Sequence, residues 1–367
     1  MQVNPFKPTA GKTPPAIIGR ESVLEEFIEG MQNGPGAPGR LMRISGVRGT
    51  GKTVLLREVR DIARDLGWMT VDEIATEGLC TRILSRVTSS KHVKSAVVEA
   101  SVLGISLGSV QVEHVGPSLR DAMSAAIRKN GHGLLITLDE VQDAALDEVR
   151  VLATTIQRLI GDDLDIAFVF AGLPSMIDGV INGKTLTFLR RAVPFELKAV
   201  DRGEVAFSLA DTFSDSGIAL DERAAAELAD ASRGYPFLIQ LVGYHVWQQA
   251  SRANADAVDA TILERGILVA KERFMYSVVE PALQRVSPMA IAYLLAMAKD
   301  DGRSSDSGDI ATRLGKTTRS LSVPRARLIR DSLIEAPSWG KVSFAIPYMA
   351  DYLNEHREEL EDMLAAG

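Results

Sequence analysis

The sequence predicts an α/β fold: a P-loop parallel sheet with helices on both faces, an all-helical lid and a C-terminal winged helix-turn-helix. Three observations support it. Short apolar strands alternate with helical patterns in residues 1–200, as in parallel-sheet proteins. Helical patterns alone fill residues 201–285. Residues 286–367 contain helix, short helix, helix and a β-hairpin pattern. We therefore expect three domains with these boundaries.

A glycine-rich loop follows the first predicted strand. The apolar run of residues 41–44 leads into a G-x-x-x-x-G-K-[ST] pattern, made of Gly46, Val47, Arg48, Gly49, Thr50, Gly51, Lys52 and Thr53. Glycines let consecutive backbone N–H groups converge on phosphate oxygens. We expect Lys52 to reach the β- and γ-phosphates and Thr53 to offer its hydroxyl to Mg²⁺. Because a helical apolar stripe begins at Val54, the strand–loop–helix context predicts a nucleotide-binding loop that includes Val54.

Two acids end a second apolar strand. Residues 134–138 are nearly all apolar, and Asp139 and Glu140 follow them. In a parallel sheet this position opens onto a site at the carboxyl edge. Asp139 is expected to hold Mg²⁺ through water, and Glu140 to orient or deprotonate the attacking water. Adjacent acids also occur at ordinary helix N-termini. The phosphate loop earlier in the chain favours the functional interpretation, with ATP and Mg²⁺ as cofactors.

The rest of the first domain supplies the alternation of strands and helices. Strands are expected at residues 68–71, 166–171 and 193–197, and helices at residues 23–28, 79–87 and 118–129. Residues 102–112 favour a hairpin. They contain G-x-S-x-G at Gly104, Ser106 and Gly108, but β-type residues continue past the second glycine. Since a nucleophile elbow needs a strand-to-helix turn, we expect no hydrolase serine here.

Two arginines, Arg190 and Arg191, precede the last expected strand of this domain. At such an edge either side chain could reach the γ-phosphate of a neighbouring subunit as an arginine finger, which requires a homo-oligomer. A structural or solvent-exposed role is at least as compatible with the sequence.

The region of residues 201–285 is predicted to be all-helical. Helices are expected at residues 202–213, 221–232 and 236–250 and from about residue 257, with Asp221 as an N-cap. Gly234-Tyr235-Pro236 interrupts this pattern. Since proline suits the first turn of a helix, a structural cap is the default interpretation of Pro236.

The C-terminal region is predicted to be a winged helix-turn-helix. Helices are expected at residues 288–298, 308–315 and 323–334, and wing strands at residues 335–338 and 341–346. Ile310–Arg330 contains no acid and six bases, namely Arg313, Lys316, Arg319, Arg325, Arg327 and Arg330. On an acidic protein this local bias favours contact with duplex DNA phosphates. Winged helices also dock on proteins, so that alternative stays open.

Composition excludes several other classes. The net charge of −7 argues against a wholly basic nucleic-acid coat. No apolar stretch approaches the roughly 20 residues that span a membrane, and the N-terminus has no apolar core typical of a secretory signal. Cys80 is the only cysteine, which suits the cytoplasm. The five histidines (His92, His114, His132, His245 and His356) lack metal-ligand spacing with it.

Together these motifs resemble the P-loop ATPases of the AAA+ class. The nearest groups are origin-recognition initiator ATPases, archaeal-type and STAND-like ATPases, and actinobacterial ATP-binding proteins with an Asn-Pro-Phe start and a Leu-Gly-Lys-Thr turn. The resemblance implies that Gly19 and Arg20 lie in a box that contacts adenine, and that Pro236 lies against the base. Initiators usually carry a polar sensor where this chain has Ala171-Gly172, and a lid arginine where it has Gly-Tyr-Pro. Both departures favour slow hydrolysis.

These observations predict an ATP-binding, slowly hydrolysing switch protein that binds duplex DNA and is not tied to a membrane. The alternative is a STAND-like signalling or scaffold ATPase whose winged helix docks on a protein partner. A small-molecule kinase finds little support, because no acceptor-binding feature stands out in the sequence.

Overall fold

The computed structural model describes residues 3–9, 12–89, 112–174, 177, 187–284 and 286–366. Its contacts divide the chain into two compact units. The sheet unit comprises Gly19–Gly46 and Gly51–Lys198, and the helical unit comprises Met1–Ile18, Val47–Thr50 and Ala199–Gly367. Among the described residues, no helix combines the length and apolar character needed to cross a membrane.

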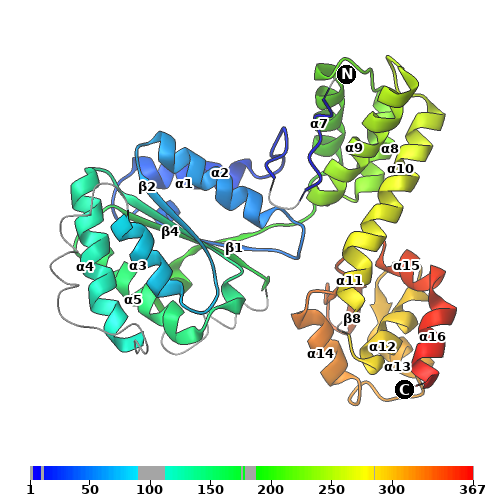
Figure 1. Ribbon diagram of the computed structural model, residues 1–367. Helices are drawn as coiled ribbons and strands as arrows, with labels where there is room; N and C mark the ends of the chain where they lie inside the picture. Colours follow the sequence, from blue (N-terminus) through cyan, green and yellow to red (C-terminus); the bar gives the residue numbers. More distant parts are fainter. Residues whose placement is uncertain are drawn as a thin grey trace. The chain divides into compact units, whose positions relative to one another are not determined.

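The sheet unit contains a five-stranded parallel sheet with the strand order β2-β3-β4-β1-β5 (Figure 1). Its strands are β1 (Leu41–Ser45), β2 (Met69–Ile74), β3 (Leu134–Asp139), β4 (Ile166–Gly172) and β5 (Val193–Glu196). Strands β3 and β4 are buried along their whole length, as expected when helices cover both faces. Since Ser45 pairs with Gly172 and Leu138 pairs with Phe170, the carboxyl ends of β1, β4 and β3 are neighbours.

Helices cover both faces of this sheet, which confirms the predicted α/β fold with a parallel sheet. On one face α1 (Glu21–Gln32) and α2 (Lys52–Asp65) pack on strand residues such as Ile44 and Val169. On the other face lie α3 (Leu79–Ser89), α4 (Val112–Asn130) and α5 (Leu146–Gly161), packed on residues such as Ile136 and Phe168 (Figure 1). Alternate side chains of the same strands thus supply two separate cores.

Some boundaries differ from the predictions. Helix α4 begins at Val112 and not at residue 118, where its start was expected. The expected start was too late because Gly116 and Pro117, which usually mark a helix boundary, lie within this helix. The expected hairpin and its G-x-S-x-G pattern lie outside the described residues, apart from Val112. Helix α5 lies between the two acids and β4, where the sequence analysis assigned no element.

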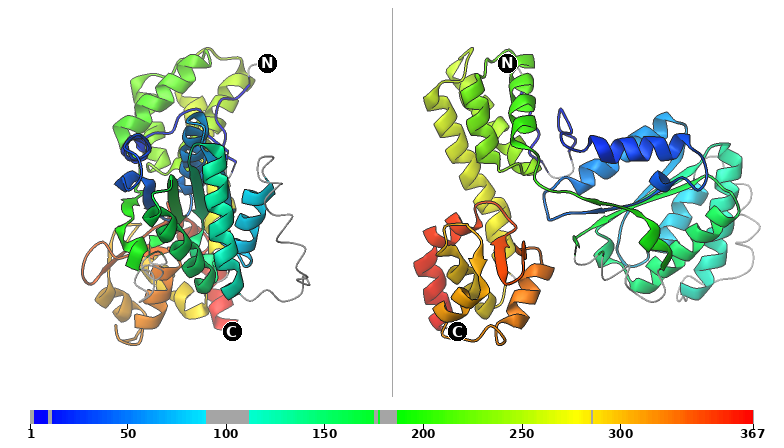
Figure 2. Two further views of the ribbon diagram at one scale, coloured as in Figure 1. Left: turned by 90° about the vertical axis from the view of Figure 1, so that its left-hand side faces the viewer. Right: turned by 180° about the vertical axis from the view of Figure 1, so that it is seen from behind.

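The first part of the helical unit is a group of packed helices, seen from two further sides in Figure 2. They are α7 (Arg202–Asp215), α8 (Glu222–Ser232), α9 (Pro236–Ala253) and α10 (Ala260–Phe274), followed by the π-helical turn η4 (Met275–Val279) and α11 (Glu280–Leu283). Side chains of Asp201, Asp221 and Asp259 accept N–H groups at the starts of α7, α8 and α10. These caps satisfy helix-terminal donors, and the predicted cap at Asp221 is confirmed.

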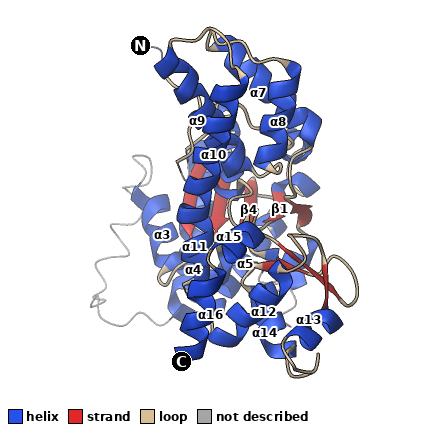
Figure 3. Cartoon of the chain, turned by 90° about the vertical axis from the view of Figure 1, so that its right-hand side faces the viewer, coloured by secondary structure: helices blue, strands red, loops and turns tan. Residues whose placement is uncertain are grey.

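The last part of the helical unit combines short strands with helices (Figure 3). Its elements are α12 (Pro288–Ala298), β6 (Ser305–Asp306), α13 (Ser307–Arg313), α14 (Ser322–Arg330), β7 (Ile334–Glu335), β8 (Lys341–Phe344), α15 (Met349–Glu355) and α16 (Arg357–Ala366). The strands pair antiparallel in the order β6-β8-β7. Helix α12 is apolar and buried nearly all round, so it forms the centre of this part.

Two predictions for this part were wrong in detail. The third helix ends at Arg330 rather than Ile334, because Ser332 adopts a left-handed backbone with a φ of 56°. Ile334 then joins β7, which spans only two residues. Helices α15 and α16 were not foreseen.

Candidate functional site

The glycine-rich loop joins β1 to α2. Gly49 and Gly51 have φ angles of 81° and 91°, in the left-handed region that glycine adopts without strain. Helix α2 begins at Lys52, which is only 5% exposed, and its Nζ donates a hydrogen bond of 2.9 Å to the Gly46 carbonyl. A helix N-terminus after a glycine-rich turn offers free N–H groups and a positive dipole end, which suit a phosphate.

Thr53 and Asp139 are brought together although they are far apart in the sequence. The Thr53 Oγ1 donates to Asp139 Oδ2 at 2.5 Å. Asp139 is nearly buried, and its other oxygen accepts the Glu140 N–H at 2.9 Å. A hydroxyl and a carboxylate are the oxygen ligands that Mg²⁺ prefers, so this pair fits the predicted cation.

Glu140 follows in a left-handed backbone conformation, with a φ of 51°. Such a conformation costs a non-glycine residue about 1–3 kcal/mol, and it is found at active sites as well as at turns and helix ends. The Glu140 carboxylate accepts a hydrogen bond from the Gln142 Nε2, and the Gln142 Oε1 accepts the Leu173 N–H at 3.3 Å. Gln142 was not among the predicted site residues. The only available signal was a polar residue two positions after the acids.

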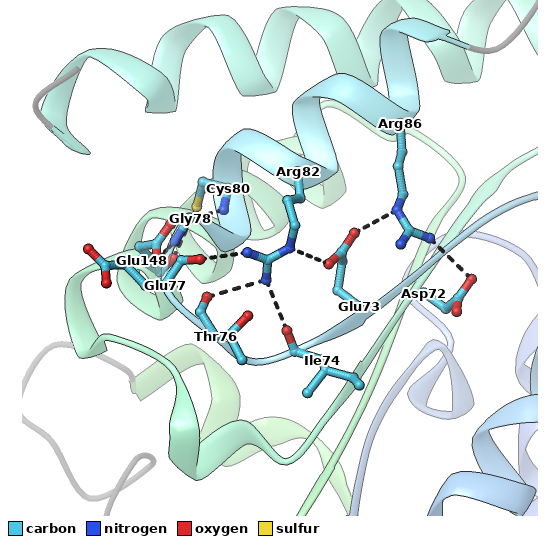
Figure 4. Close-up of polar contacts among 10 residues, drawn as sticks. All are labelled: Asp72, Glu73, Ile74, Thr76, Glu77, Gly78, Cys80, Arg82, Arg86 and Glu148. Atoms are coloured by element: carbon cyan, nitrogen blue, oxygen red, sulfur yellow. Dashed lines mark hydrogen bonds and ion pairs between the residues drawn. The ribbon is translucent and has the colours of Figure 1, made fainter. Parts of the chain in front are cut away.

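A cavity of about 400 Å³ lies beside Thr53 and Asp139, lined by charged residues of α2, β2 and α3. Figure 4 shows part of its wall. Glu73 has a side chain only 3% exposed, and it pairs with Arg82 at 2.8 Å and Arg86 at 2.7 Å. Asp72 pairs with Arg60 at 2.6 Å. The pairs with Arg82 and Arg86 compensate the buried carboxylate of Glu73 and tie α3 to β2, and the pair with Arg60 ties α2 to β2.

The start of α3 is held by Glu148 of α5 (Figure 4). Its carboxylate accepts the N–H groups of Gly78 at 2.9 Å and Cys80 at 3.1 Å. Burial raises the pKa of the Cys80 thiol to about 12, and the charge of Glu148 adds to the effect. The thiol is therefore neutral at physiological pH, and Cys80 is a core residue rather than a nucleophile.

Gly19 and Arg20 lie at the start of α1. Arg20 is 8% exposed and donates to the carbonyls of Gly19 at 2.8 Å and Lys198 at 2.9 Å. These bonds connect the start of α1 to the segment that follows β5. An adenine contact by these residues stays a prediction.

Gly234 and Pro236 connect α8 to α9. Pro236 is the first residue of α9, the position at which a missing N–H costs nothing. Gly234 has a φ of 65°, and a Cβ there would lie 2.3 Å from the Val200 carbonyl oxygen. The turn therefore requires glycine, and the structural role expected of this motif is present. Contact between Pro236 and a base stays a prediction.

Arg190 and Arg191 lie in a short 3-10 helix, η3 (Thr187–Arg191), directly before the edge strand β5. Both are exposed. This position leaves the proposed finger role untested.

The six predicted DNA-binding bases do not form one uniform surface. Lys316 and Arg319 are exposed in the turn between α13 and α14, and Arg325 lies on α14. Arg313 instead forms two hydrogen bonds to Asp300, at 2.7 and 2.6 Å, and one to the Ala296 carbonyl at 2.8 Å. It is thus tied to the end of α12.

Two further bases of this set, Arg327 and Arg330, both approach Asp331, at 3.7 and 3.2 Å. Trp339, at the tip of the β7–β8 hairpin, is fully exposed. Trp339 falls between the two expected wing strands, and no role was predicted for it.

Comparison with protein-family models matches residues 16–165 to the AAA ATPase domain and residues 276–353 to a domain of unknown function (DUF8462). No match was found among curated proteins. Residues 16–165 are therefore similar to an AAA ATPase domain.

Several solved structures share the fold over nearly the whole chain. The ORC2 protein of Aeropyrum pernix in ADPNP–ADP complexes matches with a TM-score of 0.65 and 15% identity, over 98% of this chain and 98% of that one. The Walker-type ATPase of Pyrococcus abyssi matches with 0.64 and 18%, over 92% and 96%. Cdc6p of Pyrobaculum aerophilum matches with 0.53 and 15%, over 97% and 98%. The chain thus shares the fold of these Cdc6p, ORC2 and Walker-type ATPase structures.

Proposed function

We propose that this chain, with its AAA ATPase domain, is an ATP-binding and slowly hydrolysing switch protein that binds duplex DNA through a C-terminal winged helix-turn-helix. The observation that carries the ATPase part is the approach of Thr53 to Asp139 at 2.5 Å, next to the buried Lys52. Three residues from two distant motifs thus meet at the carboxyl edge of the sheet, where parallel-sheet proteins bind ligands.

The roles of the site residues follow from their chemistry. Lys52 neutralises the β- and γ-phosphates, and the N–H groups of the glycine-rich loop bind their oxygens. Thr53 and Asp139 hold Mg²⁺, which when bound offsets the charge of the phosphates. Glu140 orients or deprotonates the attacking water. Gly19, Arg20 and Pro236 are proposed to contact the base. The ORC2 protein of Aeropyrum pernix, which has a similar fold, forms ADPNP and ADP complexes, and this supports nucleotide binding here.

Slow hydrolysis is proposed because β4 ends in Ala171 and Gly172, which bring no polar side chain to the γ-phosphate. A long-lived ATP state suits a switch. A ligand shifts a conformational equilibrium only by its differential affinity for the two states, so ATP and ADP must stabilise different arrangements.

The proposed DNA contact rests on α13, α14 and the β7–β8 hairpin. We propose that they form a winged helix, because a helix, a turn, a second helix and a hairpin follow one another in the chain. In a winged helix the helix after the turn enters the major groove. The exposed Lys316 and Arg319 in the turn suit phosphate contacts, and Arg325 and Arg327 lie in the following helix.

The test is fluorescence anisotropy of labelled random-sequence duplex DNA, titrated with protein in ATP plus Mg²⁺ or in ADP, at two salt concentrations. We expect salt-sensitive binding that differs between the nucleotides. Four to six phosphate contacts predict a slope of log K against log salt of about −0.9 per contact. Binding that ignores the nucleotide would refute the switch.

A second function is favoured by Trp339. This fully exposed aromatic side chain at the hairpin tip is typical of protein–protein anchors, and it fits a signalling or scaffold ATPase that docks on a protein. Absence of DNA binding in both nucleotide states would select this alternative.

A further inference from the structure

We propose that Gln142 is the positioning residue of the hydrolytic site. Its side-chain amide joins Glu140 to the end of β4, where Ala171 and Gly172 supply no polar side chain. The proposal rests on the ATPase function proposed above.

Both the nitrogen and the oxygen of the Gln142 side-chain amide form hydrogen bonds. Its Nε2 donates to the Glu140 Oε2, and its Oε1 accepts the Leu173 N–H at 3.3 Å. Gln142 lies in the short 3-10 helix η2 (Val141–Asp143), whose N-cap is Glu140. The turn that gives Glu140 its left-handed backbone therefore also brings Gln142 back towards its carboxylate.

The contact completes a chain of polar contacts along the carboxyl ends of β1, β4 and β3. The Lys52 ammonium donates to the Gly46 carbonyl at 2.9 Å, and the Gly46 N–H donates to the Gly172 carbonyl at 3.3 Å. The next residue after Gly172 offers its N–H to Gln142. This series of hydrogen bonds, with the peptide bond between positions 172 and 173, joins Lys52, Gly46, Gly172, Leu173, Gln142 and Glu140. Glu140 is thereby connected to the base of the phosphate loop.

Gly172 leaves the space that Gln142 occupies. A Cβ at position 172 would lie 2.7 Å from the Gln142 Oε1 and 2.9 Å from Cγ1 of Val141. A side chain on β4 at this position and the amide of Gln142 therefore exclude each other. The absence of a side chain at position 172 therefore allows the Gln142 amide to lie at the end of β4.

This arrangement fixes the orientation of Glu140. Its main-chain N–H is held by Asp139, and its Oε2 is held by Gln142, which leaves Oε1 for a water molecule. A general base must be within hydrogen-bond reach of the proton that it takes, so a carboxylate held in one orientation supports catalysis. Gln142 itself need not touch the nucleotide.

The decisive variant is Gln142→Glu, which keeps the shape and can still accept the Leu173 N–H but cannot donate to Glu140 when ionised. Gln142→Ala removes both bonds, and Gly172→Ala displaces the amide without touching it chemically. The matched control is Gln157→Ala, an exposed glutamine on α5. For each variant, single-turnover ATP hydrolysis gives the rate of the chemical step, and fluorescent-nucleotide titration gives the affinity.

We expect Gln142→Glu, Gln142→Ala and Gly172→Ala to lower the hydrolysis rate about 10- to 100-fold, a part of the contribution typical of a general base, with nucleotide affinity nearly unchanged. In a Glu140→Gln background, Gln142→Ala should have no further effect, because both residues act through one carboxylate. A merely structural role would lower the rate in both backgrounds.

Two results distinguish a failure of the positioning role from a failure of the ATPase proposal. If the wild type hydrolyses ATP and Gln142→Glu does so at the same rate, the positioning role is refuted and the ATPase proposal stands. If the wild type binds ATP without hydrolysing it, or does not bind it, both proposals are refuted.

Discussion

The proposed nucleotide site and the C-terminal basic face are built in contrasting ways. The basic face is the set of six bases between Arg313 and Arg330. Lys52, Thr53, Asp139 and Glu140 come from two motifs that follow different strands. The Thr53–Asp139, Asp139–Glu140 and Lys52–Gly46 hydrogen bonds nevertheless span only 2.5–2.9 Å. The basic face comes from one short stretch of sequence, and several of its bases pair with nearby acids. The packed core fixes the positions of residues at strand ends. Long surface side chains, in contrast, can pair with any acid that lies nearby.

The pairs on the basic face differ in strength. Arg327 and Arg330 share Asp331 in exposed contacts, which contribute about 0–1 kcal/mol and leave the arginines able to exchange the acid for a phosphate. Arg313 makes two short bonds to Asp300, which favours retention of that pair. The hydrogen bonds and charge of Asp300 raise the pKa of Arg313, and those of Arg313 lower the pKa of Asp300.

The largest expected effect in the nucleotide site is that of Glu140→Gln. Loss of the base should lower hydrolysis by about 10²- to 10⁴-fold and leave ATP binding intact. The measurement is single-turnover hydrolysis together with nucleotide titration. Asp143→Asn, which changes an exposed acid in the same turn, is the control. Unchanged turnover in Glu140→Gln would show that another group handles the water.

Lys52→Ala tests the phosphate loop. Lys52 is proposed to contact phosphate, so removal of its buried ammonium should weaken ATP binding by about 100-fold. This factor agrees with about 1.5–3 kcal/mol for a hydrogen bond to a charged group. Calorimetric titration with ATP plus Mg²⁺ measures it, and Lys129→Ala on the exposed surface of α4 is the control. Retained affinity in Lys52→Ala would contradict the phosphate-loop assignment.

The same contrast explains what the sequence could predict. The glycine pattern and the two acids predicted which residues lie at the strand ends, because strand–loop–helix geometry leaves them few alternatives. Gln142 was missed because its role depends on the left-handed turn at Glu140 and on the neighbouring β4 end, and neither is encoded locally. The pairing of Arg313 was missed because Asp300 lies outside the acid-free stretch.

Charge substitutions on the basic face should have a moderate effect that differs between positions. Arg325→Ala with Arg327→Ala should weaken DNA binding and reduce the salt slope by about 2, since each phosphate contact contributes about 0.9. Anisotropy titrations across a salt series measure the slope. An unaltered slope would refute the basic-face hypothesis.

Arg313→Ala sharpens the comparison on the same face. Since Arg313 is tied to Asp300, its loss should leave the salt slope unchanged and lower the melting temperature by a few degrees, about 1 kcal/mol. A reduced slope with unaltered melting would return Arg313 to the DNA-contacting set and show that surface pairing does not decide which bases bind phosphate.

The smallest expected effect concerns Arg190 and Arg191, the two exposed arginines before the edge strand β5. If one of them completes the site of a neighbouring subunit, hydrolysis per chain should rise with protein concentration. Arg190→Ala or Arg191→Ala should then flatten that rise without changing ATP affinity. Arg158→Ala, on the exposed surface of α5, is the control. A rate independent of concentration in the wild type would contradict the finger. It would also mean that the nucleotide site is complete within one chain, with Glu140 and Lys52 sufficient for its slow chemistry.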